Sequence, residues 1–188
     1  MKVCFALIVD MKMHNYARKL AFEINEKYDT GFIAARLPQH ITLGPVFEVE
    51  DIKAVEEYFD FIVDKIAPLE VTFKNMDLKL FGDEDEGLGV LWMDIKESNE
   101  LREHHNRIYK DIKEYSWKAE TWSSDEVYHF HSTIALGQQP PSVYKEIFKH
   151  IEDKDISHTC IIDEIAMFCT TEGDGKLGSY ITYKILPL

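Results

Sequence analysis

The chain has 188 residues, 45% of them hydrophobic, so it is long enough to bury a core without a metal or a disulfide. Its 34 acidic and 21 basic residues give a formal charge of −13. Long nucleic acids are held mainly by neutralisation of their phosphates, so this charge excludes a stable complex with a long duplex and leaves a small nucleotide or an RNA end as the expected partner.

The first half of the chain predicts three strands and two helices. Residues 3–9 form a continuous apolar run, which is typical of a buried central strand and too short to cross a membrane. Apolar residues recur at helical spacing in residues 11–29 and 50–66, so we expect two amphipathic helices there. Residues 39–46 and 69–81 are expected to be strands.

The second half predicts a similar series. The expected elements are a strand at 88–95, a helix at 98–117, a strand at 129–136, a helix at 141–152, and strands at 156–170 and 177–186. The three cysteines lie in apolar, strand-like runs and form no CxxC pair. We therefore expect buried free thiols, as in a cytoplasmic protein that does not bind to membranes.

The two halves share one order of elements when they are aligned with an offset of 91 residues, although their residue identity is poor. Agreement across the whole chain predicts an α+β fold of two similar lobes related by a pseudo-two-fold axis. We expect two antiparallel-rich sheets around a central cleft, with the helices on the outside. No Pro- or Gly-rich linker separates the halves, so residues 1–188 are predicted to form a single bilobal domain.

One short motif occurs in each half, as His40-Ile41-Thr42-Leu43 and His131-Ser132-Thr133-Ile134. Side chains alternate along a strand, so His40 and Thr42 face the same way, as do His131 and Thr133. Ser132 is a polar exception on the face that points to the core. Two such copies predict a site that holds two imidazoles and two hydroxyls.

These groups suit the chemistry of a phosphate ester. Histidine titrates near neutral pH, so a neutral copy can take a proton from the nucleophile while a protonated copy gives one to the leaving oxygen. The hydroxyls of Thr42 and Thr133 can stabilise the non-bridging oxygens. Neither a metal nor another cofactor is needed. We take His40 as the acid and His131 as the base, although pseudo-symmetry makes this choice nearly arbitrary.

The segments His40-Ile41-Thr42-Leu43-Gly44 and His131-Ser132-Thr133-Ile134-Ala135-Leu136 resemble the paired HxTx motifs of the two-histidine (2H) phosphoesterase superfamily. That resemblance implies a bilobal α+β fold and metal-free hydrolysis of 2′,3′-cyclic phosphates or 2′-5′ phosphodiester bonds. It also implies catalytic roles for His40 and His131 and phosphate-binding roles for Thr42 and Thr133. Proline often precedes the motif histidine in this family; here Gln39 and Phe130 hold those places.

Several side chains outside the motifs are also of interest. Arg36, Tyr180 and Tyr183 are expected to contact the substrate, the tyrosines by stacking on a base. His129 alternates with His131 and can share its face. His105, on the helix at 98–117, is expected to be solvent-exposed, as is its neighbour His104.

Three other functions stay open at the level of sequence. The fold can serve as a non-catalytic nucleotide- or RNA-binding module, or ligate RNA by the reverse chemistry. A metal-dependent hydrolase would need carboxylates or histidines at ligand spacing, and the sequence offers no convincing set. The sequence defines neither the substrate, the product isomer nor the oligomeric state.

Overall fold

The computed structural model describes residues 1–83, 87–120, 128–137, 139–171 and 178–188. Within these residues the helices are α1 (Met11–Tyr28), α2 (Ile52–Val63), α3 (Asn99–Glu114), α4 (Pro141–Ile151) and the 3₁₀ turn η1 (Ala34–Arg36). The strands are β1 (Lys2–Ile8), β2 (His40–Thr42), β3 (Phe47–Glu48), β4 (Leu69–Phe81), β5 (Leu88–Ile95), β6 (Lys118–Ala119), β7 (His131–Leu136), β8 (His158–Ile162), β9 (Glu164–Thr170) and β10 (Ile181–Pro187).

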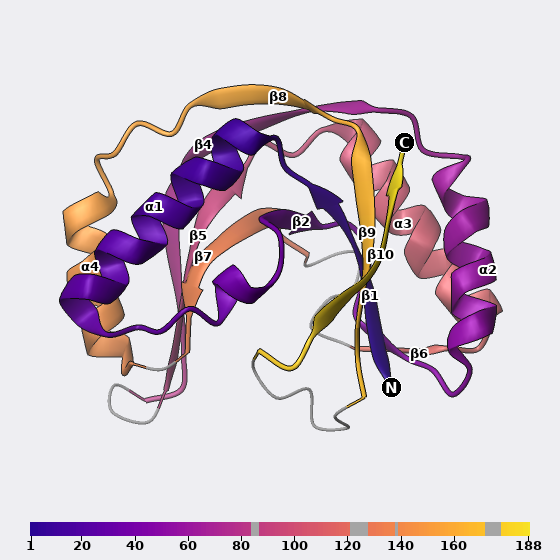
Figure 1. Cartoon of the computed structure of the whole chain (residues 1–188), viewed down its shortest axis with the longest axis horizontal. Helices are drawn as coiled ribbons and strands as arrows, with labels where there is room; N and C mark the ends of the chain where they lie inside the picture. Colours follow the sequence, from indigo (N-terminus) through magenta and orange to yellow (C-terminus); the bar gives the residue numbers. More distant parts are fainter. Residues whose placement is uncertain (84–86, 121–127, 138, 172–177) are drawn as a thin grey trace.

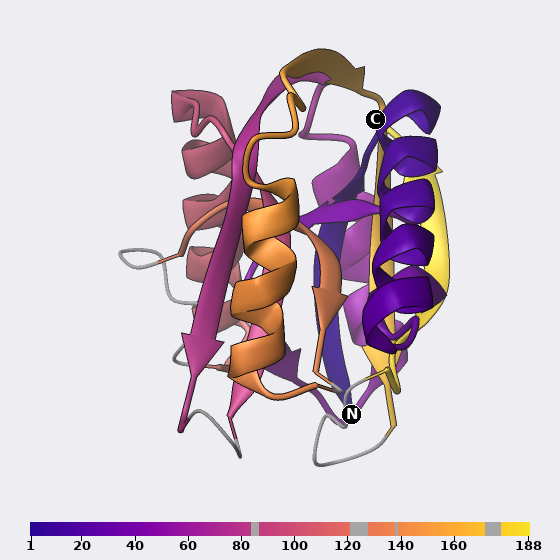
Figure 2. The same ribbon diagram turned by 90° about the vertical axis from the view of Figure 1, so that its left-hand side faces the viewer.

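The strands form two antiparallel sheets (Figure 1). One has the order β10-β9-β1-β3-β6, with β2 also paired to β1; the other has the order β7-β5-β4-β8. Helices α1 and α4 lie on one side of the molecule and α2 and α3 on the other (Figure 1), and α4 packs along β4 and β5 (Figure 2). The predicted α+β fold with two antiparallel sheets is confirmed.

Each sheet combines strands from both halves of the sequence. In the larger sheet, β1 pairs with β9, so that Phe5 lies opposite Met167. In the smaller sheet, β4 of the first half lies between β5 and β8 of the second half. The halves therefore share their sheets, because neither β1 nor β5 has all of its neighbours within its own half.

Apolar periodicity and capping side chains explain the helices. Helix α1 begins after Asp10, whose carboxylate accepts a hydrogen bond from the amide of Met13 (2.9 Å). It ends at Asp29, which takes the left-handed conformation with φ 50°. Ser98 caps α3 in the same way, through the amide of Leu101 (3.2 Å). None of the described helices is both long enough and apolar enough to cross a bilayer.

Strand β1 is buried on both faces. Phe5 points toward the helices and packs on Phe47 and Phe59, with ring centroids 5.5 and 5.1 Å apart. Cys4, on the opposite face, belongs to a small second cluster with Phe168. The three thiols are all free and buried, as predicted.

Two predicted strands are each divided in the structure. The apolar run at 156–170 breaks at Asp163, and its parts, β8 and β9, belong to different sheets. The segment 39–46 leaves the strand after Thr42, and the chain then turns closely around α3. A Cβ on Gly44 would lie 2.6 Å from Cγ2 of Ile108, so glycine permits that approach.

The expected exposure of His105 is wrong. Its side chain is fully buried, because α3 packs against the segment that follows β2. Nδ1 of His105 lies 2.7 Å from the carbonyl oxygen of Leu43, and its ring stacks on Tyr128 at 4.8 Å. A satisfied hydrogen bond thus allows a histidine to occupy the buried face of an amphipathic helix.

The shared sheets predict that the halves cannot fold alone. Fragments that end at Gly82 and begin at Leu88 should each be unfolded when separate, because β1 would lose β9 and β5 would lose β4. Mixing them should restore the secondary structure of the intact chain. Circular dichroism and amide NMR spectra of each fragment, the mixture and the intact control measure this. Cooperative thermal unfolding of either fragment alone would contradict the shared-sheet architecture.

Candidate active site

The motif strands lie next to each other where the two sheets meet. Strand β2 pairs with β1 and strand β7 pairs with β5, and β2 and β7 contact one another (Figure 1). His40 lies opposite Ile8, and His131 opposite Asp94. The fold thus brings together two motifs that are 91 residues apart in the sequence.

The alternation predicted for the motifs is present in the burial of their side chains. His40, Thr42, His131 and Thr133 are all partly exposed. The residues between them, Ile41 and Ser132, are fully buried. We call the surface formed by the four partly exposed residues the motif face.

Each motif imidazole is held by the backbone two residues before it. Nδ1 of His40 lies 2.7 Å from the carbonyl oxygen of Pro38, and Nδ1 of His131 lies 2.7 Å from that of His129. A carbonyl oxygen can only accept, so both Nδ1 atoms carry a proton. In the neutral rings Nε2 therefore keeps a free lone pair, and it is the atom left for chemistry.

Burial sets the proton affinity of His40. The ring packs edge-on against Phe168, with centroids 4.7 Å apart. Burial lowers the pKa of His40 from its ordinary 6.5 to about 4, and the charges of His131 and Arg18 act in the same direction, against the hydrogen bond to Pro38. His40 is therefore neutral over the physiological range.

His131 lies in a different electrostatic setting. Its ring packs on Trp92 with centroids 4.6 Å apart, and burial lowers its pKa. The charges of His129 and Lys79 lower that pKa too, whereas the carboxylate of Asp94 raises it. His131 thus has a nearby anion that favours its protonated form.

Asp94 is the centre of an ion-pair cluster beside His131. Its carboxylate is almost fully buried and binds the Nζ of Lys74 at 2.6 Å and the Nε2 of His129 at 2.5 Å. The carbonyl of His129 is also the anchor for His131. His129 therefore supports the motif face from the side, an arrangement that its alternation with His131 suggested.

A family model described as the 2′-5′ RNA ligase superfamily matches residues 13–174. The chain belongs to this superfamily. Among solved structures, it is similar to TT0787 of Thermus thermophilus, with a TM-score of 0.58, 11% identity, and coverage of 100% of this chain and 98% of that one. A search of curated proteins gave no match.

Two further solved structures are similar in fold to this chain. One is E. coli LigT complexed with 3′-AMP, with a TM-score of 0.52, 15% identity, and coverage of 100% of this chain and 97% of that one. The other is described as a phosphoesterase, with a TM-score of 0.54, 15% identity, and coverage of 100% and 98%. At such identities the likeness concerns the fold, and it shows that this chain shares the fold of these proteins.

The three residues expected to contact the substrate lie in different places. Tyr180 packs against the small cluster that contains Phe168, on the side of the sheet that carries His40. Arg36 is exposed and donates from Nη1 to the carbonyl of Gly178 (3.0 Å). Tyr183 bonds Glu56 of α2 through its hydroxyl (3.3 Å), so it points to the helix side, away from the motif face.

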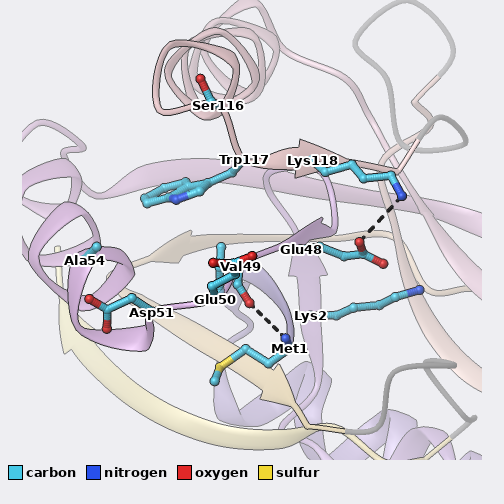
Figure 3. A pocket seen from close by; sticks show the side chains of 10 residues that line it. All are labelled: Met1, Lys2, Glu48, Val49, Glu50, Asp51, Ala54, Ser116, Trp117 and Lys118. Carbon is cyan, nitrogen blue, oxygen red and sulfur yellow. Dashed lines mark hydrogen bonds and ion pairs between the residues drawn. The ribbon is translucent and has the colours of Figure 1, made fainter.

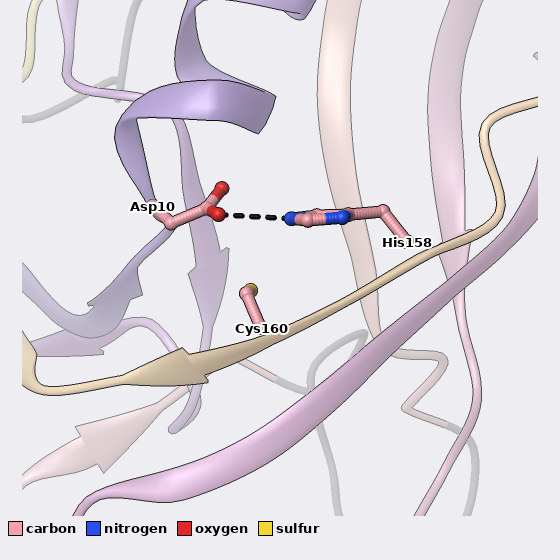
Figure 4. Close-up of side chains that lie close together, drawn as sticks. All are labelled: Asp10, His158 and Cys160. Carbon is pink, nitrogen blue, oxygen red and sulfur yellow. Dashed lines mark hydrogen bonds and ion pairs between the residues drawn. The ribbon is translucent and has the colours of Figure 1, made fainter.

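A second cluster of titratable side chains lies where α1 begins, outside the superfamily motifs (Figure 4). Asp10 contacts Nε2 of His158 at 2.8 Å, and Nδ1 of His158 contacts Nζ of Lys12 at 3.3 Å. Burial raises the pKa of the Cys160 thiol to about 11, so the thiolate that a metal would need is disfavoured. The hydrogen bonds already satisfy this cluster, which joins α1 to β8.

A hollow of about 710 Å³ lies between the N-terminus and the residues that follow α3 (Figure 3). Two of its charged groups have partners: Lys118 contacts Glu48 at 3.6 Å, and the amino group of Met1 donates to the carbonyl of Val49 at 2.9 Å. No motif residue lines it. It is therefore separate from the motif face.

The anchored rings lead to a direct spectroscopic prediction. At pH 7, both His40 and His131 should be neutral with the proton on Nδ1, because each donates to a carbonyl. On acidification His40 should titrate near pH 4 and His131 below pH 6.5, since burial disfavours both cations. Long-range ¹H–¹⁵N imidazole spectra, assigned with His40→Gln and His131→Gln, measure tautomer and pKa. A proton on Nε2, or a His40 pKa at or above 6.5, would contradict the assignment.

Proposed function

We propose that this protein is a metal-independent phosphodiesterase that hydrolyses 2′,3′-cyclic phosphates or 2′-5′ phosphodiester bonds of nucleotides or RNA ends. One observation carries this proposal: the two motif imidazoles come from strands that contact one another, and each binds a carbonyl through its Nδ1 proton, so that both Nε2 atoms are left for chemistry. The ligand named for E. coli LigT, 3′-AMP, is a product of the kind that such a reaction gives.

The electrostatic difference between the two histidines assigns their roles. A pKa of about 4 keeps His40 deprotonated, as a general base must be. The pKa of His131 is also lowered, mainly by burial, but the carboxylate of Asp94 opposes this lowering, and an anionic phosphate beside the ring would act in the same direction as Asp94. We therefore assign His40 as base and His131 as acid, the reverse of the order expected from sequence.

The proposed reaction is a single displacement at phosphorus. Nε2 of His40 takes a proton from a water molecule while the oxygen of that water forms a bond to phosphorus. The bond from phosphorus to one ribose oxygen breaks, and that oxygen receives the proton on Nε2 of His131. The hydroxyls of Thr42 and Thr133 donate to the non-bridging oxygens, where negative charge grows. Protons and charge balance between the two rings without a metal.

Local charge makes the motif face suitable for a small anion. The chain as a whole is acidic, but Arg18 and Lys79 are near enough to the imidazoles to lower their pKa values. Positive charge concentrated at one face suits a single phosphate better than a long polyanion. We propose Arg36 and Tyr180 as further contacts for the ribose or the base, and we leave Tyr183 out because of its bond to Glu56.

The first test is turnover of nucleoside 2′,3′-cyclic monophosphates in EDTA. His40→Ala and His131→Ala should each lower kcat by roughly 10²–10⁴-fold, because each removes a positioned proton-transfer group. Thr42→Val and Thr133→Val should lower it by about 10²-fold, through loss of a donor to the phosphate. Chromatography that separates 2′- from 3′-phosphates identifies the leaving oxygen.

The control for this test is His150→Ala, a substitution on α4 at a surface contact with Lys27. It should leave kcat unchanged. If the parent turns over none of the cyclic nucleotides and no 2′-5′-linked oligonucleotide, the phosphodiesterase proposal is wrong. Retained nucleotide binding in that case would favour a binding module.

The role assignment has its own test, based on the leaving group. A nucleoside p-nitrophenyl phosphodiester has a leaving group that needs no proton. The fold-loss of activity in His131→Ala should therefore be at least about tenfold smaller on this ester than on the cyclic substrate, because the variant lacks only the general acid. His40→Ala should lose similar activity on both. The reverse pattern would show that His40 is the acid.

A further inference from the structure

The reverse face of the motif strands holds two buried polar side chains, Gln39 and Ser132, exposed by only 2% and 0%. Nε2 of Gln39 donates to the hydroxyl of Ser132 and to the carbonyl of Thr133, each at 2.8 Å. The hydroxyl of Ser132 in turn donates to the carbonyl of His40 at 2.7 Å. Three hydrogen bonds thus join β2 to β7, and two of them end on the backbone of motif residues.

Gln39 uses every polar group that it has. Its backbone amide donates to Nδ1 of His14 (3.3 Å), and its carbonyl accepts from the amide of Val9 (3.2 Å). Its Oε1 accepts from Nη1 of Arg18 (3.4 Å), which leaves Nε2 for the bonds across to β7. A rotated amide would place Oε1 against the carbonyl of Thr133, acceptor against acceptor, so the partners fix one orientation.

This pair breaks the pseudo-two-fold symmetry. The residues at the equivalent positions, Phe130 and Ile41, are apolar and also buried. Packing at such positions therefore does not require polar groups, and burying polar groups is favourable only when their hydrogen bonds are satisfied. Unlike apolar packing, the hydrogen bonds of the polar pair have defined lengths and partners. They therefore fix the separation of β2 from β7 and the register between the two strands.

We propose that Gln39 and Ser132 are positioning residues that set the separation of His40 and His131 for catalysis. This proposal rests on the phosphodiesterase function proposed above. The bridge holds the carbonyl of His40 on one strand and that of Thr133 on the other, so its loss frees both strands to shift. A displacement of about 1 Å at reacting groups can cost on the order of 10²-fold in rate. The substrate is not touched, so its binding should change little.

Gln39→Met and Ser132→Ala test the bridge in the full chain. Each should lower kcat on 2′,3′-cyclic nucleotides by about 10- to 100-fold and change KM by less than about threefold. The double variant should lose less than the product of the two single losses, because both remove the same bridge. Ser132→Ala removes a single oxygen atom, so it changes the packing little. The kcat of every variant is expressed per folded molecule, so that a loss of folded protein is not counted as a loss of rate.

Matched controls separate positioning from general loss of stability. Gln139→Met makes the same change at a glutamine outside the bridge, whose Nε2 donates to the carbonyl of Asp29 at an exposed contact. Ser98→Ala makes the same change as Ser132→Ala at the cap of α3, and it should lower Tm. Both controls should keep the parent kcat.

Gln39→Glu probes the same bridge by titration as well as by rate. A carboxylate cannot donate to Ser132 or Thr133. Because residue 39 directly precedes His40, the negative charge of the carboxylate should also raise the pKa of the His40 ring. Imidazole NMR titration should show the rise for His40, whereas the pKa of His131 should rise less. Gln139→Glu, the matched control, should move neither.

The outcomes distinguish this inference from the proposed function. An active parent with unchanged kcat in Gln39→Met and Ser132→Ala would overturn the positioning role. An inactive parent would overturn the proposed function, and the imidazole spectra would then test whether Gln39 and Ser132 position the two histidines. Shifted His40 and His131 resonances in Ser132→Ala, with unshifted ones in Ser98→Ala, would support it; unshifted resonances in both would overturn it.

Discussion

The hydrogen bond from each motif imidazole to the carbonyl two residues earlier is the interaction on which the site depends. It links a side chain to its own strand, so the ring is oriented wherever the strand lies. It also determines which nitrogen remains available, because the carbonyl accepts a hydrogen bond from Nδ1–H and so keeps the proton on that nitrogen. The position of Nε2 thus becomes a matter of backbone geometry, and the placement of β2 beside β7 becomes the central structural requirement.

Sharing of strands between the halves meets that requirement. Because β1 lies between β2 and β9, and β5 between β7 and β4, each motif strand is paired to a strand whose other neighbour comes from the opposite half. A rigid displacement of one half would disturb both sheets at once. Sheet pairing brings β2 and β7 together, and the buried hydrogen bonds of Gln39 and Ser132 then set the finer separation of the two strands.

Local patterns predicted which motif side chains share a face and missed the contacts that support them. Strand alternation was sufficient to place His40 with Thr42 and His131 with Thr133, because period two depends only on the chain itself. The division of 156–170 at Asp163 was not predicted, since both parts contain apolar residues and the sheet that each part joins is decided by distant residues. His105 was misplaced for a similar reason: its partner, the carbonyl of Leu43, is 62 residues away.

Some of the missed residues did leave a signal in the sequence. Ser132 stood out as a polar residue among core-facing ones, and Gln39 stood where proline is often found in the family. Each anomaly is resolved by the other, since their side chains bond one another across the strands. Asp94 gave no such signal, because a single carboxylate inside the predicted strand at 88–95 does not by itself indicate a partner.

The electrostatic surroundings of the two motif histidines bear on how the proposed site handles an anion. Burial alone would leave both rings neutral, and a neutral pair supplies a base but no acid. A bound phosphate changes this balance, because its charge favours protonation of the ring that already lies near Asp94. The substrate would then bring about the charged form of His131 that its own leaving group needs. Discrimination against uncharged esters follows from the same electrostatics, since a neutral ester cannot recruit that proton.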